Sequence, residues 1–449
     1  MKKTMMLWLF LLLLLLPKFA FSADATRLQS VVALALEHAP TLQAAEAARD
    51  AAAEDITLGR AWLLPYVVAN GSLTRRNQDF SYDRTIGFLT TTVRNNEQIY
   101  GIKAYQPLFD VEKWAIYQQG KISAATGEVK LAIQRQQTIL QASAAWLDVI
   151  RAQATFSAAK ASEQAMNTLA MQAKAAFEVG TAAINDSLSA RSRRDLTKAA
   201  RIRAGQALAL SQAQLNSLVG KNLPVSVELY QGIEPLHVSK DKLEVWEQRA
   251  EATSLGVQLS DQALAMADAE HLKSVGGAMP TLQLVAGWDY NKSSQGIFVG
   301  STVKSASIGI EMSIPLYAGG STWAEQRKAS KEKIQAEFNM AEAKRTARLA
   351  ARQSLLGLRT TAAEVEALDA ALSSAKMEKK AAQAGFEVGI RTITDALDAE
   401  ERLAAARQRY ADAVARHAMA YLQLMASSNH LAKSTVEKID QLLTGSEHE

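Results

Sequence analysis

Two carboxylates, Asp395 and Asp398, lie three residues apart in the stretch "VGIRTITDALDAE". Residues at this spacing share one face of a helix. Two acidic groups that lie so near each other repel, so bound cations would stabilise their ionised forms. Acidic residues also favour the first turn of a helix, because of the helix dipole. The pair therefore predicts either a face that attracts cations or ordinary helix-start chemistry.

The rest of the sequence gives no support for catalysis. The six His residues are scattered, without a pair at metal-ligand spacing. The stretch "LYAGGST" lacks the Gly-Lys-Ser/Thr ending of a phosphate-binding loop. A nucleophile elbow and a zincin motif are also missing from the sequence. We therefore expect neither an enzyme nor a metal or cofactor site.

The acidic pair follows a sequence that occurs twice. "FEVGTAAINDSL" begins at Phe177, and "FEVGIRTITDAL" begins at Phe386, 209 residues later. Each copy starts 63 residues after a tryptophan, Trp114 in the first and Trp323 in the second. Loops tolerate insertions, so equal lengths without a gap indicate a duplicated module whose length is mechanically constrained.

The segments between each tryptophan and "FEVG" are predicted to be long helices. They contain no Pro and are rich in Ala, Gln, Lys, Arg and Glu, which favour helix. About 63 helical residues span roughly 95 Å. Gly180 and Gly389 can adopt the left-handed conformation that closes a helix, and a second helix then starts near Asp186 and Asp395. "FEVG" is thus predicted to be the tip of a long helical hairpin in both copies.

Before each hairpin the hydrophobic period changes from helical to two. "TLQLVAGWDY" and "SIGIEMSIP" alternate apolar with polar or small residues, as half-exposed strands do. Weaker versions occur at about residues 66–74 and 99–108, and the polar stretch between them is predicted to be a hairpin loop. A shorter helix is expected before each strand pair, at roughly residues 28–60 and 242–272.

These patterns divide the chain into a leader, two repeats and a tail. Residues 1–22 have the charged start, apolar run and small-residue end of a secretory signal peptide. Charge is nearly balanced, with 50 Lys and Arg against 46 Asp and Glu, which does not suggest a nucleic-acid binder. The first repeat is expected at residues 23–230, with strands at about 65–109 and a hairpin at about 113–220. The second is expected at residues 231–430, with strands at about 281–316 and a hairpin at about 322–427. Residues 431–449 are expected to be a tail.

Four strands with an apolar face imply that several chains share one sheet. Open strand edges cannot be left in a bilayer, and single-chain barrels need about eight strands or more. Three chains would supply twelve strands, although two or four chains would also close a barrel.

With these features the chain resembles the TolC family of outer-membrane efflux and type I secretion proteins. The resemblance lies in the duplicated module, in "QPLFD" and "IPLYAGG" before the long helices, and in the paired "FEVG" turns. The resemblance implies a mainly α homotrimer, whose α-barrel continues into a shared twelve-stranded β-barrel in the lipid of a Gram-negative outer membrane. It also implies passive conduction of substrates from an inner-membrane transporter, ABC or proton-driven, through a periplasmic adaptor protein.

The resemblance also assigns roles to residues of both repeats. Asp395 and Asp398 would form a selectivity ring at the periplasmic entrance. Arg391 would hold this entrance shut by bonding across chains near Asp186, and Phe386 stands where the family often has a latch Tyr. An aromatic girdle at the inner leaflet is predicted for Tyr105, Phe109, Trp114, Tyr317 and Trp323. Plain core packing would explain the two tryptophans equally well.

Two other classes of protein remain open from the sequence alone. One is a periplasmic coiled-coil spacer without a pore, and the other is an adaptor protein, since adaptors also carry long helical hairpins. The two copies of a strand pair argue against both. The transported substrate is not readable from the sequence, because a wide passive tube needs no substrate pocket.

Overall fold

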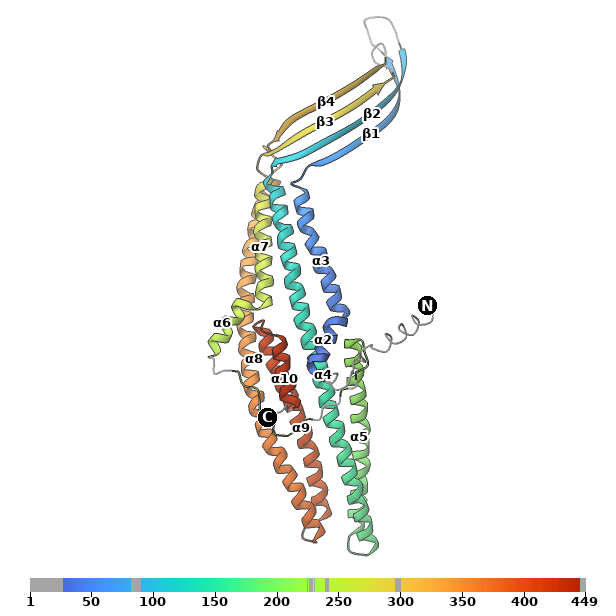
Figure 1. The fold of residues 1–449 in the computed structure, drawn as a ribbon, viewed down its shortest axis with the longest axis vertical. Helices are drawn as coiled ribbons and strands as arrows, with labels where there is room; N and C mark the ends of the chain where they lie inside the picture. Colours follow the sequence, from blue (N-terminus) through green and yellow to red (C-terminus); the bar gives the residue numbers. More distant parts are fainter. Residues whose placement is uncertain are drawn as a thin grey trace, which may run out of the picture. The chain divides into compact units, whose positions relative to one another are not determined.

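The computed structural model describes residues 27–81, 90–223, 225, 229, 231–238, 242–294 and 300–444 (Figure 1). The signal peptide expected at residues 1–22 lies outside them. The chain divides into two compact units, which are described separately. The first unit consists of the described parts of Met1–Gln43, Gln134–Ser254 and Ala347–Glu449, and the second of those of Ala44–Ile133 and Leu255–Thr346. Each unit contains segments of both repeats, so a sequence repeat is not itself a compact domain.

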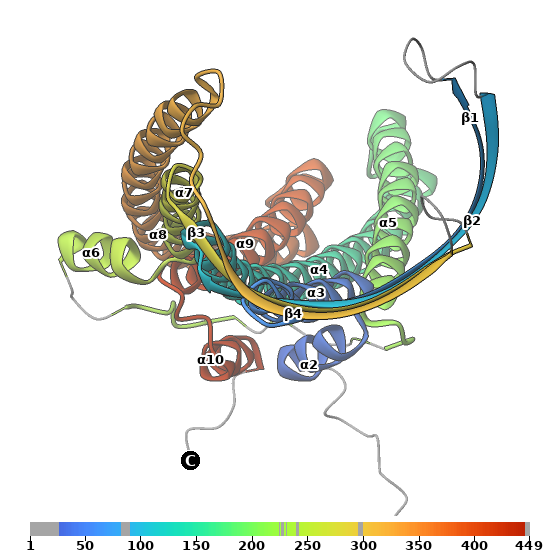
Figure 2. The ribbon, with the colours of Figure 1, turned by 90° about the horizontal axis from the view of Figure 1, so that it is seen from above.

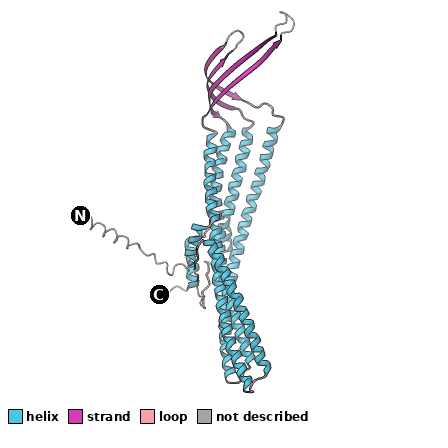
Figure 3. Ribbon diagram, turned by 90° about the vertical axis from the view of Figure 1, so that its right-hand side faces the viewer, coloured by secondary structure: helices cyan, strands magenta, loops and turns pink. Residues whose placement is uncertain are grey.

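The first unit contains most of two helical hairpins, whose long helices begin in the second unit. Helix α4 (Val111–Glu178) turns into α5 (Ile184–Val219), and α8 (Ser321–Glu387) turns into α9 (Ile393–Ser427). The two long helices have 68 and 67 residues, and the two shorter ones have 36 and 35. Helices and strands occur in the same order in both halves of the chain, which confirms the duplicated module. Figure 3 shows the helices and the strands in separate colours.

The core of the first unit is a continuous apolar cluster between these helices. Every hairpin helix contributes to it, and its buried members are mostly Leu, Val, Ile and aromatic residues, with a few alanines where helices approach closely. Burial of this cluster, rather than helix propensity alone, stabilises helices of this length. Its largest fully buried side chains include Trp146, Ile150, Leu215, Leu355, Leu358, Leu422 and Leu424.

Two short helices near the chain ends pack together in the first unit. The carboxylate of Asp440 on α10 (Lys433–Thr444) accepts hydrogen bonds from the backbone N–H groups of Leu28, at 2.6 Å, and Gln29, at 2.9 Å, at the start of α2 (Leu28–His38). An acid at a helix N-terminus satisfies donors that have no partner within the helix. The segment expected to be a tail, residues 431–449, therefore contains a docked helix.

The expected single helices at residues 28–60 and 242–272 are each broken in two. Helix α2 ends at His38, the backbone of Ala39 is extended, and α3 (Pro40–Ala61) follows. A residue before proline disfavours the helical region, which explains this break. Likewise α6 (Leu243–Thr253) and α7 (Leu255–Gly276) are separated by Ser254, whose backbone is also extended.

Residues 231–238, which we call the strap, are fastened to the second hairpin by side chains. The backbone N–H of Gly232 donates to Asp369 at 3.1 Å, that of Ile233 to the hydroxyl of Tyr410 at 3.3 Å, and that of Leu236 to His417 Nε2 at 2.9 Å. These bonds replace the ladder that an irregular segment lacks.

A four-stranded antiparallel sheet dominates the second unit. Its strands are β1 (Tyr66–Ser81), β2 (Thr90–Phe109), β3 (Thr281–Ser293) and β4 (Ser301–Ser313), hydrogen-bonded in the order β1-β2-β3-β4. Seen from above, the sheet is bowed across its strands (Figure 2). Within the described chain, β1 and β4 each have a neighbouring strand on one side only.

Strand register divides the sheet into an apolar and a polar face. Ala69, Ile102, Trp288 and Ala306 form one row across the four strands. The next row on this face is Val67, Ala104, Ala286 and Ile308, and the adjoining row on the opposite face is Asn70, Gly101, Asp289 and Ser305. Ile308 and Ile310 are 76% and 65% exposed, so the described residues of this chain leave much of the apolar face uncovered.

The first strand pair is longer than predicted. The polar stretch expected to be a loop is largely strand, because β1 continues to Ser81 and β2 begins at Thr90. Arg75 pairs with Asn96, and Asn77 with Arg94. Backbone pairing does not need apolar side chains, so strands can continue where both faces are polar. This prediction of a loop was wrong over most of its length.

Close helix packing supports the sheet within the second unit. A Cβ atom at Gly120 of α4 would lie 2.3 Å from the backbone oxygen of Asp55 on α3, so only glycine fits at this contact. Beside it, the hydroxyl of Ser123 donates to the carboxylate of Asp55 at 2.5 Å. Gln119 donates to Glu270 of α7 at 2.6 Å. Helix α4 is thus joined to both α3 and α7.

Candidate functional site at the two hairpin turns

The two hairpin turns share one backbone geometry. Gly180 and Gly389 have φ values of 76° and 77°, in the left-handed region that favours glycine. In the first turn, the N–H of Gly180 donates to Phe177 O at 2.9 Å, and that of Thr181 donates to Ala176 O at 2.8 Å. The second turn repeats both bonds, from Gly389 to Phe386 and from Ile390 to Gly385. Both turns are therefore Schellman caps of the preceding long helix.

The helix after the second turn begins with a capping box. Thr392 Oγ1 accepts from the Asp395 N–H at 3.2 Å, and the Asp395 carboxylate accepts from the Thr392 N–H at 2.9 Å and hydroxyl at 2.7 Å. These bonds, first the one from the hydroxyl and then the one from the backbone, hold the pKa of Asp395 below its ordinary value. Asp395 thus performs the helix-start role that the sequence left open.

The first turn has no such box. Ala183 occupies the position that corresponds to Thr392, and its side chain makes no cap bond. Asp186, the counterpart of Asp395, donates its backbone N–H to Ala183 O at 3.1 Å.

Asp398 is paired with an arginine from the other hairpin. Arg193 of α5 donates through Nη1 to the Asp398 carboxylate of α9, and the same nitrogen lies 3.3 Å from Glu401 Oε1. Hydrogen bonding to Asp398 raises the pKa of Arg193. Asp395 and Asp398 are therefore engaged with different partners. Arg193 was not predicted from the sequence.

Phe386 and Arg391 have different environments beside the second turn. Phe386 is half-buried against an apolar cluster in which α4 and α5 of the first hairpin meet α9 of the second. Arg391 is exposed, and its aliphatic carbons occupy the space where a Cβ of Gly385 would lie, 2.9 Å from Cγ. No ion pair joins Arg391 to Asp186 within the described chain, and the predicted contact between them was one across chains.

An ion pair between a half-buried lysine and a buried glutamate joins the two helices of the second hairpin. The Lys379 ammonium on α8 lies 2.8 Å from the carboxylate of Glu400 on α9, and the Glu400 side chain is only 3% exposed. Removing one partner of a buried pair leaves an uncompensated charge, so the pair fixes how these helices pack.

The predicted girdle residues all belong to the second unit. Tyr105 of β2 stacks on Tyr66 of β1, with ring centroids 6.3 Å apart. Phe109, Trp114, Tyr317 and Trp323 are exposed. Exposure of this kind excludes core packing within the described chain as the role of the two tryptophans.

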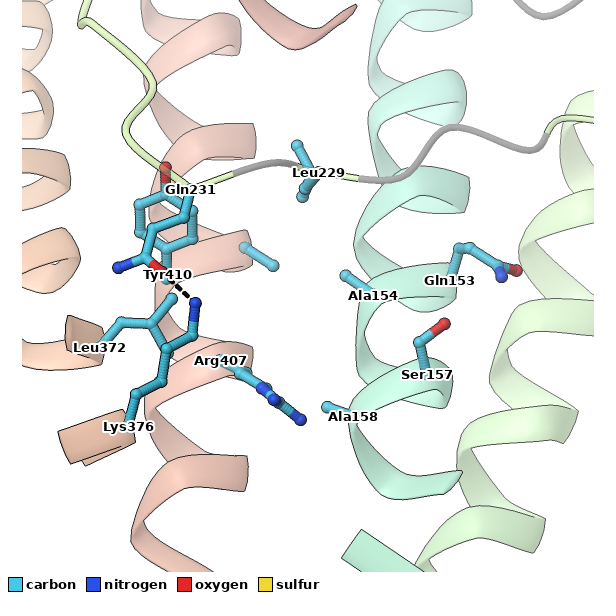
Figure 4. A pocket seen from close by; sticks show the side chains of 11 residues that line it. Gln153, Ala154, Ser157, Ala158, Leu229, Gln231, Leu372, Lys376, Arg407 and Tyr410 are labelled. Carbon is cyan, nitrogen blue, oxygen red and sulfur yellow. Dashed lines mark hydrogen bonds between the residues drawn. The ribbon is translucent and has the colours of Figure 1, made fainter. Parts of the chain in front are cut away.

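A cavity of about 300 Å³ opens elsewhere in the first unit (Figure 4). Arg407 and Lys376 line it, and the dashed line in Figure 4 marks the hydrogen bond from Lys376 to Gln231 of the strap. Neither the turn residues nor the girdle residues line this cavity, so it is separate from the candidate site.

The described part of the chain offers no other centre of chemistry. Among its residues, no three His, Asp or Glu side chains come together as they would around a metal ion. None of the helices in these ranges combines the length and apolar character needed to cross a membrane.

Known proteins resemble the chain over nearly its whole length. A family model described as "Outer membrane efflux protein" matches residues 31–221 and 248–430, one match in each repeat. The Vibrio cholerae outer membrane protein TolC is 26% identical over 439 residues, covering 95% of this chain and 98% of the relative. The Pseudomonas aeruginosa alkaline protease secretion protein AprF is 25% identical, covering 97% and 91%.

Solved structures show the same fold. The Vibrio cholerae outer membrane protein VceC has a TM-score of 0.76 and 16% identity, with 89% of this chain and 95% of that chain covered. The Campylobacter jejuni CmeC outer membrane channel has a TM-score of 0.77 and 16% identity, with 93% and 89% covered. Because the family model matches both repeats, the chain belongs to the outer membrane efflux protein family, a family of channel proteins of the outer membrane.

Proposed function

We propose that three copies of this chain form the exit duct of an efflux or type I secretion system. The observation that carries this proposal is the four-stranded sheet with an exposed apolar face and two open edges. An unpaired strand edge in lipid costs several kcal/mol per unsatisfied backbone group. Pairing β4 of one copy with β1 of the next removes every edge, and three copies give twelve strands.

In this proposal the helical hairpins form the wall of a duct in the periplasm. A passive tube conducts without consuming energy, so transport is driven by an inner-membrane transporter, ABC or proton-driven, coupled through a periplasmic adaptor protein. The family described by efflux and the relative named for protease secretion support the export function of the duct. A cleaved signal peptide at residues 1–22 delivers the chain to the periplasm.

We further assign the hairpin turns to the periplasmic mouth. Three copies arrange Asp395 and Asp398 as rings of carboxylates, which favour cations in a pore. Arg391, Asp186 and Phe386 form the contact that narrows this mouth, and the exposed position of Arg391 supports its availability to a neighbouring copy.

The exposed aromatic residues of the second unit suit the interface between lipid and water. Outer-membrane barrels carry aromatic girdles at both interfaces. Tyr105, Phe109, Trp114, Tyr317 and Trp323 provide such a girdle around the periplasmic end of the shared barrel. The exposure of Phe109, Trp114, Tyr317 and Trp323 in one chain supports this role.

One experiment tests the proposal directly. Detergent-solubilised protein should have the mass of a trimer in light scattering, and it should form ion-conducting channels in planar bilayers. The variant with Asp395→Ala and Asp398→Ala should remain a trimer and conduct with weaker cation preference. A stable monomer without conductance would overturn the duct, and an unchanged reversal potential in the double variant would overturn the rings.

A further inference from the structure

Arg193 connects the two hairpins beside two acidic residues of the candidate mouth. It lies on α5, and both of its acidic partners, Asp398 and Glu401, lie on α9. The Arg193 side chain is only 24% exposed, so water and salt screen its charge less than they screen a surface charge. One guanidinium faces two carboxylates, and the cluster therefore keeps a net negative charge.

Comparison of the repeats shows that this contact is specific to Arg193. Its counterpart is Arg402, at the same position of the second repeat. Arg402 pairs at 3.2 Å with Glu378, in its own hairpin, and is 59% exposed. The counterpart of Glu378 is Leu169, which belongs to the apolar cluster between the hairpins. With Leu169 in place of an acid, Arg193 has its acidic partners in the other hairpin.

The two helices that follow the turns have diverged in charge at matching positions. Over the third turn, α5 carries Arg191, Arg193 and Arg194, whereas the corresponding residues of α9 are Glu400, Arg402 and Leu403. At two further positions in this region, Ser189 and Ser192 of α5 correspond to Asp398 and Glu401 of α9. After duplication, the start of α5 is thus basic and the start of α9 is acidic, and Arg193 of α5 meets two of the acids of α9.

We propose that Arg193 is a specificity-determining residue of the mouth, because it sets how much of the negative charge of Asp398 and Glu401 a passing cation meets. This inference rests on the proposed function. Asp395 stands outside the pairing, since Thr392 is its partner. In the native channel Arg193 therefore partly neutralises the Asp398 ring, whereas the charge of Asp395 interacts with Arg391 and Arg402.

Replacing Arg193→Gln tests this assignment in planar bilayers. Removal of the guanidinium should shift the reversal potential toward the value of a channel that conducts only cations. It should also lower the concentration of Ca²⁺ that half-blocks the current from the helical side, by about tenfold at low salt, because each Asp398 and Glu401 pair loses its compensating charge. Adding Asp398→Asn to Arg193→Gln should restore block close to the native value, since opposite charges are then removed together.

Arg194→Gln is the matched control. It removes the same charge one residue away, from a side chain that pairs with its chain neighbour Asp195 at 2.7 Å. Its block and reversal potential should stay near the native values, and Arg193→Lys, which keeps the charge, should also do so. Light scattering on each variant checks that the trimer persists.

Three results would overturn the assignment. The first is that Arg193→Gln has the same Ca²⁺ block and reversal potential as Arg194→Gln. The second is that adding Asp398→Asn does not restore the native Ca²⁺ block, and the third is that Arg193→Lys forms an intact trimer but behaves like Arg193→Gln. Failure of the proposed function gives a different result, because the native protein would then form no channels at all.

Discussion

The first and second hairpin turns have the same backbone but different side-chain contacts. Both close their long helix with a left-handed glycine and the same pair of hydrogen bonds. Only the second turn adds a capping box, between Thr392 and Asp395. At the first turn, Ala183 offers no cap, and Asp186 remains half-buried.

This contrast separates what the hairpin needs from what the second turn adds. Chain reversal requires the glycine, and both copies keep it. The polar contacts differ because they are not needed for reversal, and they gather in the second hairpin, where Asp395, Asp398 and Arg391 are found. The second turn is therefore the more defined of the two, and it is the better candidate for a site that must hold charges in place.

The largest difference between the hairpins is expected in how their stability depends on pH, because only the second contains a particular buried histidine. His417 of α9 accepts the Leu236 N–H of the strap through Nε2, and its Nδ1 lies 3.1 Å from Thr361 Oγ1. The ring is therefore neutral, with its proton on Nδ1. The corresponding residue of the first hairpin is Leu208, which does not titrate.

Burial, together with the nearby charge of His237, lowers the pKa of His417 from 6.5 to about 4. The unfolded chain binds more protons than the folded chain between these values, so stability falls as the pH drops from about 6.5 to about 4. The loss should reach about 3 kcal/mol per chain. Burial raises the pKa of Asp440, which acts in the opposite direction.

The midpoint of thermal unfolding, followed by circular dichroism between pH 4 and pH 7, measures this effect. His417→Gln keeps an acceptor for the strap but cannot titrate, so its midpoint should depend less on pH than that of the native protein. Equal pH dependence in both proteins would exclude His417 as the group responsible.

Substituting the turn glycines should show that both turns depend equally on a left-handed backbone conformation. A side chain in the left-handed region costs about 1–2 kcal/mol. Nothing else lies within 4 Å of a Cβ built at Gly180 or Gly389, so this strain is the only expected cost. Gly180→Ala and Gly389→Ala should therefore lower the unfolding midpoint by similar amounts. Unequal shifts would show that one turn has contacts which the other lacks.

A smaller effect is expected from the cap, and it should differ between the turns. Thr392→Ala removes the capping box and should cost about 1 kcal/mol. Amide hydrogen exchange in the first turn of α9 should then be about fivefold faster. Ala183→Thr should slow exchange at the start of α5, because Asp186 already stands at the position that completes a box. No change in α5 would mean that the first turn cannot form this cap.

The sequence predicted well the features that depend on local patterns. Hairpin length follows from uninterrupted helix formers, and the turns follow from the glycine that ends "FEVG". The breaks at Ala39 and Ser254 were missed, because the hydrophobic pattern continues through both. The extension of β1 past Thr74 was missed because polar residues there hide the alternation of the two faces.

Contacts between distant segments were the least predictable part of the site. Arg193 and Asp398 are 205 residues apart, and nothing beside either residue marks the other as its partner. Only alignment of the two repeats suggests the pairing, through serine at positions 189 and 192 and acids at the matching positions of α9. The resemblance indicated where the acidic pair lies, but not what neutralises it.

Cysteine cross-linking tests the shared sheet most directly, because the native chain contains no cysteine. Ser305→Cys on β4 should be combined in turn with Val68→Cys, Asn70→Cys and Ser72→Cys on β1, all on the polar face. If β4 of one copy pairs with β1 of the next, oxidation of at least one combination should give covalent dimers and trimers on a non-reducing gel, and the single-cysteine variants should give no trimer. Absence of trimers from every combination would contradict the shared sheet and, with it, the duct.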